Sequence, residues 1–171
     1  MERWFALAVV VVATAAGSAG ATRPRAGSAG VTIAVPTGWH TWVPPGGVAG
    51  NVTDPLTRIV AVSAPFRFAA CGCQVAAYAF PGEAVALVVV EWIGSTPGTA
   101  WPPRPHRFTR TTLPLHPPPS IECFDGPGGS AQFADHGRRF GAYILIGRRA
   151  SPALADRARH VLDTLRVNRR R

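Results

Sequence analysis

The cysteines have the most distinctive spacing of any reactive side chains in this chain. Cys71 and Cys73 are separated by one residue, and Cys123 lies far downstream. In an exported protein such cysteines are expected to oxidise. A ring between near neighbours would be strained, so we predict a disulfide between Cys73 and Cys123, with Cys71 as the alternative partner. This bridge would stabilise the fold by about 3 to 4 kcal/mol. The third thiol is then structural or a thiol-exchange site.

Glu91 is the one acidic residue attached to a strand of buried type, at the end of the run 84–92. A carboxylate there can act as a general acid or base, with Arg107, Arg139 and Trp92 as the expected neighbours. The alternative, which we favour, is that Glu91 pairs with an arginine or lies just outside the core.

Other catalytic and metal-binding signals are weak. The chain has no Gly-x-Ser-x-Gly, no His-Glu-x-x-His and no phosphate loop. A zinc site would need histidines to converge with the cysteines, and no ligand spacing predicts it. The histidines concerned are His40, His106, His116 and His136. We therefore predict no catalytic residue, no metal and no cofactor.

Aromatic residues gather near the ends of the expected strands, together with histidine, glutamate and arginine. Such a set could bind a glycan or a peptide, or it could cap an open sheet core. We call it the predicted rim, and its members are Trp39, His40, Trp42, Glu91, Trp92, Trp101 and Arg107.

The formal net charge of +9 first suggests a polyanion partner. However, residues 31–168 carry twelve arginines and eight acids, and much of the excess lies in Arg23, Arg25 and the tail 169–171. The chain has no lysine and is rich in Ala, Gly, Pro and Arg, which is typical of a GC-rich bacterial genome. We expect the two ends to be solvated arms and nucleic-acid binding to be unlikely.

The chain begins like a secretory signal peptide. Arg3 precedes an apolar run over 5–16, and small residues end at Ala21, after which we predict cleavage. The run is too short to span a bilayer, although retention as an anchor is the alternative. We therefore predict a signal peptide over 1–21, a flexible leader over 22–30, one α/β domain over 31–168 and a basic tail over 169–171. We expect the mature protein to be secreted or extracytoplasmic, monomeric and without a transmembrane helix.

The best-organised stretch is a β-hairpin followed by a closing helix. His136-Gly137 suits a two-residue turn. The run 140–146 is apolar on both faces, which predicts a central strand. Ser151 and Pro152 predict the start of a helix whose apolar stripe packs, while its charged residues, Arg159 included, face solvent.

The remaining strands follow from shorter apolar runs, and loops lie between them. A short helix is expected over 74–80, and turns and loops over 40–55 and 93–119. The strands are predicted at 31–35, 58–66, 84–92, 107–113 (at an edge) and 121–124.

The order of these elements resembles the Mog1/PsbP-like α/β/α sandwich of small exported bacterial proteins. The motif-like pieces are the turn Pro36-Thr-Gly-Trp39 and the closing helix that ends in Leu165-Arg-Val. The resemblance implies an α+β fold, in which a mostly antiparallel sheet of about five to seven strands is packed by a C-terminal helix and a short helix.

The resemblance implies an accessory or binding role more than an enzyme, since the fold carries no common catalytic residues. We therefore predict a non-enzymatic binding or accessory domain of the bacterial cell envelope, with an unknown protein or envelope ligand as partner. The alternative is a thiol-active or hydrolytic enzyme that uses the odd cysteine or Glu91.

Overall fold

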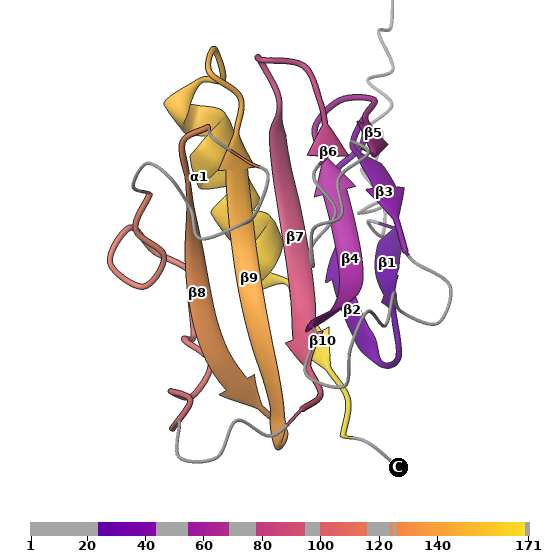
Figure 1. Ribbon diagram of the computed structural model, residues 1–171, viewed down its shortest axis with the longest axis vertical. Helices are drawn as coiled ribbons and strands as arrows, with labels where there is room; N and C mark the ends of the chain where they lie inside the picture. Colours follow the sequence, from indigo (N-terminus) through magenta and orange to yellow (C-terminus); the bar gives the residue numbers. More distant parts are fainter. Residues whose placement is uncertain are drawn as a thin grey trace, which may run out of the picture.

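The largest element is a five-stranded antiparallel sheet in the order β3-β4-β7-β9-β8 (Figure 1). The structure is a computed structural model, and it describes residues 24–43, 55–68, 78–94, 100–115, 124 and 126–169. The strands of the sheet are β3 (His40–Trp42), β4 (Pro55–Val62), β7 (Val85–Trp92), β8 (Gly128–Asp135) and β9 (Arg138–Ile146). The predicted α+β class with a mostly antiparallel sheet is therefore confirmed.

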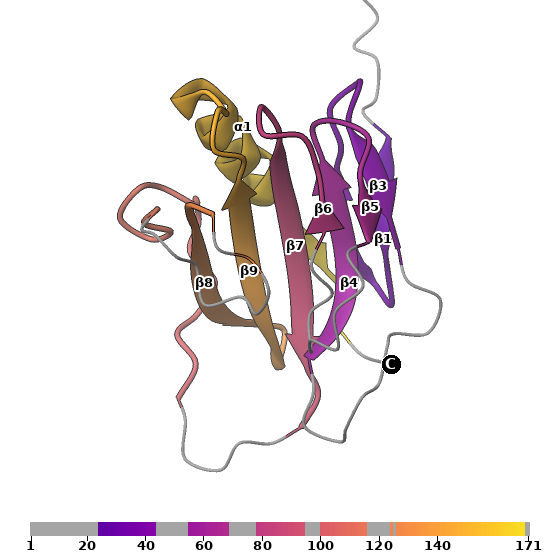
Figure 2. The same cartoon turned by 45° about the horizontal axis from the view of Figure 1, so that its top comes forward.

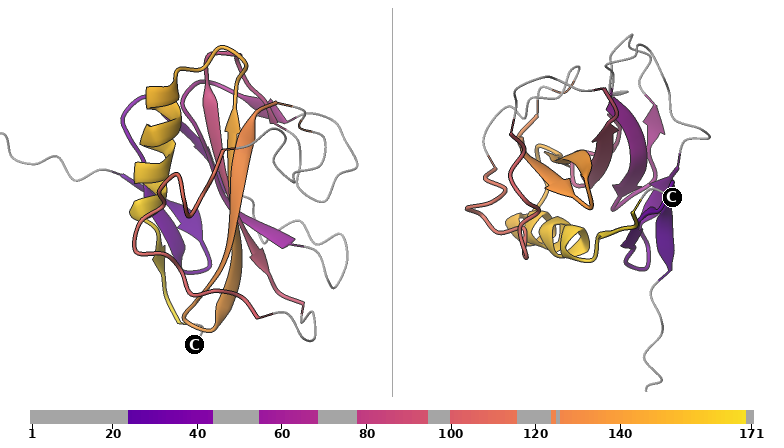
Figure 3. Two further views of the ribbon diagram at one scale, coloured as in Figure 1. Left: turned by 90° about the vertical axis from the view of Figure 1, so that its left-hand side faces the viewer. Right: turned by 90° about the horizontal axis from the view of Figure 1, so that it is seen from below.

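One face of this sheet is covered by the helix and by a second, smaller sheet. Figures 2 and 3 show helix α1 (Pro152–Asp163) beside the small sheet, both against the same face. The small sheet has the order β1-β2-β10. Its strands are β1 (Arg25–Ser28), β2 (Val31–Ala34) and β10 (Arg166–Val167). A separate pair of short strands consists of β5 (Arg67–Phe68) and β6 (Tyr78–Ala79).

The core is divided by the large sheet because side chains alternate between its faces. In β7, Val85, Leu87 and Val89 belong to the cluster beneath α1, and Ala86 and Val88 belong to the cluster on the far face. The far cluster is closed at its margin by partly buried aromatic side chains from loops and strand ends. These are Trp42, Phe66, Phe80, Trp92 and Phe124. The prediction of a central strand with two apolar faces is confirmed for β9.

The closing unit forms as its sequence predicts. Asp135 pairs with Arg138, and the two residues between them have positive φ, 50° at His136 and 72° at Gly137. These angles define a type I′ hairpin turn. The side chain of Ser151 accepts a hydrogen bond from the backbone N–H of Leu154 and caps α1.

The leader predicted over 22–30 is wrong for the part that is described, because Arg25–Ser28 form β1 and pair with β2. The turn between them, Ala29-Gly30, has positive φ at both residues and makes a second two-residue hairpin. The first 23 residues, which include the predicted signal peptide and its cleavage site, lie outside the described residues. No helix in the described part is long and apolar enough to cross a membrane.

The edge strand predicted over 107–113 is also wrong. Phe108 and Leu113 are buried, and the residues between them form a turn in which the Leu113 N–H donates to the Thr109 carbonyl. The turn is fastened to α1, because the Phe108 N–H donates to Asp163 Oδ1 at 2.7 Å. The segment therefore closes the side of the core under the helix.

Three further predictions need correction. The turn-rich stretch 40–55 contains strand β3, and Tyr78–Ala79 lie in β6, not in the helix predicted over 74–80. Residues 74–77 and 121–123 lie outside the described residues. Arg159 is 4% exposed, whereas we expected it in solvent, because its guanidinium donates to the Leu113 carbonyl and pairs with Asp156.

Candidate functional site

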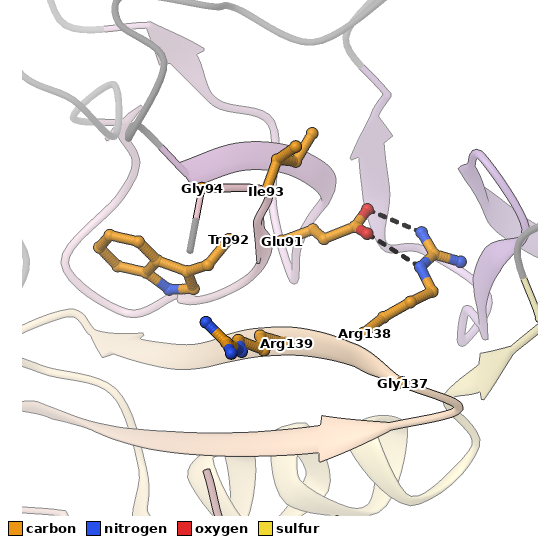
Figure 4. Close-up of a pocket in the computed structure, with 7 residues that line it drawn as sticks. All are labelled: Glu91, Trp92, Ile93, Gly94, Gly137, Arg138 and Arg139. Carbon is orange, nitrogen blue, oxygen red and sulfur yellow. Dashed lines mark hydrogen bonds and ion pairs between the residues drawn. The ribbon is translucent and has the colours of Figure 1, made fainter. Parts of the chain in front are cut away.

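The end of the large sheet at the β8–β9 hairpin turn holds a buried ionic cluster centred on Glu91. The Glu91 side chain is 1% exposed, and Arg138 approaches it with two parallel hydrogen bonds (Figure 4). Arg138 Nε donates to Oε1 at 2.9 Å, and Arg138 Nη2 donates to Oε2 at 2.7 Å. Arg58 Nε donates to the same Oε2 at 2.7 Å. Both carboxylate oxygens are therefore engaged by charged donors, which form strong hydrogen bonds.

Strand register brings these three residues together. Glu91 pairs with Phe140, so Arg138 lies diagonally opposite Glu91 on the same face of the sheet. Arg58 comes from a β-bulge, since the register of β4 against β7 shifts between Thr57 and Ile59. A bulge of this kind redirects a side chain, and here the Arg58 side chain contacts the buried carboxylate.

Arg138 also ties the ionic cluster to the small sheet. Its Nη1 donates to the backbone carbonyls of Ala29 at 3.0 Å and Asn168 at 3.1 Å, and its guanidinium carbon lies 5.2 Å from the centre of the Phe140 ring. The cluster therefore joins β7, β9, the β1–β2 turn and the end of β10. Such a cluster positions elements, because each of its charges is satisfied by the protein itself.

The electrostatics of Glu91 match this structural role. Burial alone would raise its pKa, but the hydrogen bonds from Arg138 and Arg58 lower the pKa from 4.5 to about 2. At neutral pH the carboxylate is ionised and its oxygens are occupied. A general acid or base needs a pKa near the working pH and contact with the proton that it transfers. The favoured prediction, an ion pair with arginine, is confirmed, although the partners are Arg58 and Arg138 and not Arg107 or Arg139.

The opposite face of the same sheet end carries a second arrangement, which we call the Trp92 corner and define by Trp92, Ile93, Trp101 and Arg139. Arg139 is the cross-strand partner of Trp92, and both point away from the Glu91 carboxylate (Figure 4). The indole rings of Trp92 and Trp101 lie 6.2 Å apart. Ile93 is 45% exposed and is the only exposed large hydrophobic side chain among the described residues. A cavity of about 220 Å³ opens between the ends of β7 and β9, and its lining includes Trp92, Ile93 and Arg139 of this corner as well as Glu91 and Arg138 of the ionic cluster and the glycines Gly94 and Gly137.

The polar groups of the Trp92 corner lack partners within the described part of the chain. The Nε1–H groups of Trp92 and Trp101 are buried and donate to no acceptor in the described part of the chain. No side-chain hydrogen bond or ion pair joins Arg139 to any described residue. A buried N–H without an acceptor costs about 1 to 3 kcal/mol, so a partner that displaces the side chains covering these groups and supplies acceptors would recover part of that cost.

The other members of the predicted rim are separated from this corner. His40 pairs with Val62 and Val62 with Ala86, which places β3 toward the start of β7, whereas Trp92 ends that strand. Trp39 packs against the core beneath α1, and Trp42 packs against the far cluster. Arg107 is exposed and is not among the residues that contact Glu91. Of the predicted rim, Glu91, Trp92 and Trp101 thus lie at the same end of the sheet, with Glu91 on the face opposite the two tryptophans. The other members of the predicted rim lie elsewhere.

The cysteines cannot be placed, because Cys71, Cys73 and Cys123 lie outside the described residues, as does His116. The disulfide between Cys73 and Cys123 therefore stays a prediction. Within the residues that are described, no group of three or more His, Cys, Asp or Glu side chains is arranged to hold a metal ion.

Comparisons with protein-family models, with curated proteins and with solved structures found no match to this chain. The resemblance to the Mog1/PsbP-like sandwich therefore stays a prediction from the order of elements. The assignment of function depends on the geometry of the hairpin end of the sheet.

Proposed function

We propose that this protein is a non-enzymatic binding or accessory domain that acts outside the cytoplasm of a bacterium. The signal peptide predicted over 1–21 supports the location, and the resemblance to the Mog1/PsbP-like sandwich supports an accessory role. The binding surface in this proposal is the Trp92 corner. Glu91, the residue of the hydrolytic alternative, is held between two arginines and serves the fold.

One observation carries the proposal. At the Trp92 corner Trp92, Ile93 and Arg139 line a cavity and Trp101 packs against Trp92, and neither the two buried indole N–H groups nor the Arg139 side chain has a hydrogen-bond partner among the described residues. Tryptophan and arginine are the residue types that most often dominate binding energy at interfaces. The corner suits a ligand or partner that offers a hydrogen-bond acceptor or an acidic group next to an apolar surface.

The proposal can be tested by capture of a partner from the cell-envelope fraction of the source organism. Immobilised wild-type protein should retain a component that Arg139→Ala and Trp101→Ala both lose. Arg157→Ala is the matched control, since Arg157 is an exposed arginine on α1 and its removal changes the charge equally. Equal retention by all four proteins, or retention by none, would overturn the assignment of the corner. Circular dichroism establishes that each variant is folded.

A further inference from the structure

A second groove lies on the other side of the β8–β9 turn, between the hairpin tip and β10. Its volume is about 490 Å³. One wall comes from the segment 104–106 and the hairpin residues Asp135 and His136, and the other comes from residues 165–168. β10 is the outer strand of its small sheet, so its free edge faces this groove. The groove therefore separates two parts of the chain that are distant in sequence, and it is distinct from the Trp92 corner.

The single acid in the groove is neutralised. Arg104 Nη1 donates to Asp135 Oδ2 at 3.0 Å, and His136 Nδ1 lies 2.6 Å from Asp135 Oδ1. The Asp135 side chain is only 15% exposed, whereas that of His136 is 44% exposed. The carboxylate is thus covered by its two partners, and the imidazole remains accessible from the groove.

The opposite wall carries a positive charge that no described acid pairs with. The Arg166 side chain is exposed and forms no hydrogen bond or ion pair with a described residue. A second cation lies close enough to be affected, since partial burial and then the charge of Arg166 lower the pKa of Arg25. Among the described residues no acid other than Asp135 lines the groove, so the described lining carries a net positive charge.

The donors of the groove surround a space from more than one direction. Alternation along β10 buries Val167 and places Arg166 and Asn168 on the exposed side. His106 and His136 lie on the facing wall. An arginine fork matches the oxygens of carboxylates and of phosphate-type anions, and donors from two walls can in addition reach oxygens on different sides of a tetrahedral group.

We propose that this groove binds a tetrahedral oxyanion of the phosphate or sulfate class, held by Arg166 and Asn168 from β10 and by His106 and His136 from the facing wall. The inference goes beyond the proposed function, because the groove shares no residue with the Trp92 corner. The anion is either free or part of a larger ligand.

The test is calorimetric titration of the full-length protein with inorganic phosphate, sulfate and acetate at constant ionic strength. Phosphate or sulfate should bind at one saturable site, and acetate should bind at least about tenfold more weakly. Arg166→Ala should weaken oxyanion binding at least about tenfold, since a hydrogen bond to a charged group contributes about 1.5 to 3 kcal/mol. A preference for phosphate over sulfate, or the reverse, identifies the anion.

The matched controls are Arg157→Ala, which removes one exposed arginine from α1, and Arg139→Ala, which removes the arginine of the Trp92 corner. Both should bind the anion like the wild type, and His106→Ala should weaken it. The inference is overturned if Arg166→Ala and Arg157→Ala bind equally, if acetate binds as tightly as phosphate, or if no saturable site is found. Loss of envelope capture by Arg139→Ala with intact anion binding would separate the two proposals.

Discussion

Arg138 and Arg139 are neighbours in β9, yet they meet opposite environments on the two faces of the sheet. The Arg138 side chain is 4% exposed and donates to Glu91, Ala29 and Asn168. The Arg139 side chain lies on the other face beside Trp92 and forms no ion pair with an acid in the described part of the chain. On the inner face the charge of Arg138 is satisfied by Glu91 and by backbone carbonyls, whereas on the outer face the Arg139 side chain has no hydrogen-bond or ion-pair partner among the described residues.

The difference distinguishes a structural ion-pair cluster on one face from a candidate binding site on the other. A buried carboxylate between two arginines has the composition of a catalytic site, but its closed hydrogen bonding makes it a fastening between layers. The corner on the outer face has fewer ionisable groups and more unused binding capacity.

The largest effect should come from Arg138→Ala. The substitution leaves Glu91 buried with Arg58 alone, and removing one partner of a buried pair typically costs about 3 to 5 kcal/mol of unfolding free energy. Arg139→Ala, the same change on the outer face, should cost less than about 0.5 kcal/mol. Urea unfolding of both variants measures the difference. Similar losses in the two variants would break the contrast between the faces.

The unfolding free energy should depend on pH because of the ionic cluster around Glu91. The pKa of Glu91 is lowered from 4.5 to about 2, so the stability that this carboxylate contributes is present above pH 4.5 and is lost as the pH falls toward 2. Wild type should therefore lose its advantage over Glu91→Gln as the medium is acidified across this range. Unfolding free energies of both proteins at a series of pH values check this. A constant gap would show that the carboxylate charge is not what stabilises the cluster.

A smaller effect is expected where α1 fastens the turn 107–113. Asp163→Ala removes the acceptor of the Phe108 N–H and should destabilise the protein by about 1 to 2 kcal/mol. Arg110→Ala breaks an ion pair whose arginine is 78% exposed, and such pairs contribute little. Thermal unfolding of the two variants measures both effects. If Arg110→Ala is the more harmful, the turn is held by its surface charges and not by the hydrogen bond to Asp163.

An effect of similar or smaller size concerns the hairpin turn between β8 and β9. Gly137 has a φ of 72°, and a Cβ there would meet no atom within 4 Å. Gly137→Ala should therefore cost only the backbone strain of a left-handed residue, about 1 to 2 kcal/mol or less. Gly137→Asn should recover part of that loss, because asparagine tolerates this conformation. Denaturant unfolding of the pair tests whether the turn is of type I′ in solution.

The sequence predicts the elements that carry strong local signals. The turn at His136-Gly137, the cap at Ser151 and the apolar strands of the sheet centre all form where their patterns place them. β1 was missed because Ala26-Gly-Ser28 has low strand propensity and pairs only because β2 is adjacent. The alternation over 107–113 was misleading, since Phe108 and Leu113 are anchors of a turn.

The candidate site was predicted only in part, and register explains the rest. Glu91 was expected near Arg139, but a one-residue step along a strand moves a side chain to the opposite face, so the partner is Arg138. Arg58 contacts Glu91 because of a β-bulge in β4, and no local sequence pattern predicts this bulge. The pairing of Trp92 with Trp101 was within the predicted rim, whereas β3 separates Trp39 and Trp42 from it.

The most direct test of the account is to follow the indole N–H signals of Trp92 and Trp101 by nuclear magnetic resonance, assigned with Trp→Phe variants, while the component captured from the envelope is added. The account predicts that both signals shift in the wild type and in Arg157→Ala, and that neither shifts in Arg139→Ala. Equal shifts in Arg139→Ala, or shifts confined to other tryptophans, would contradict the assignment of the Trp92 corner as the binding surface.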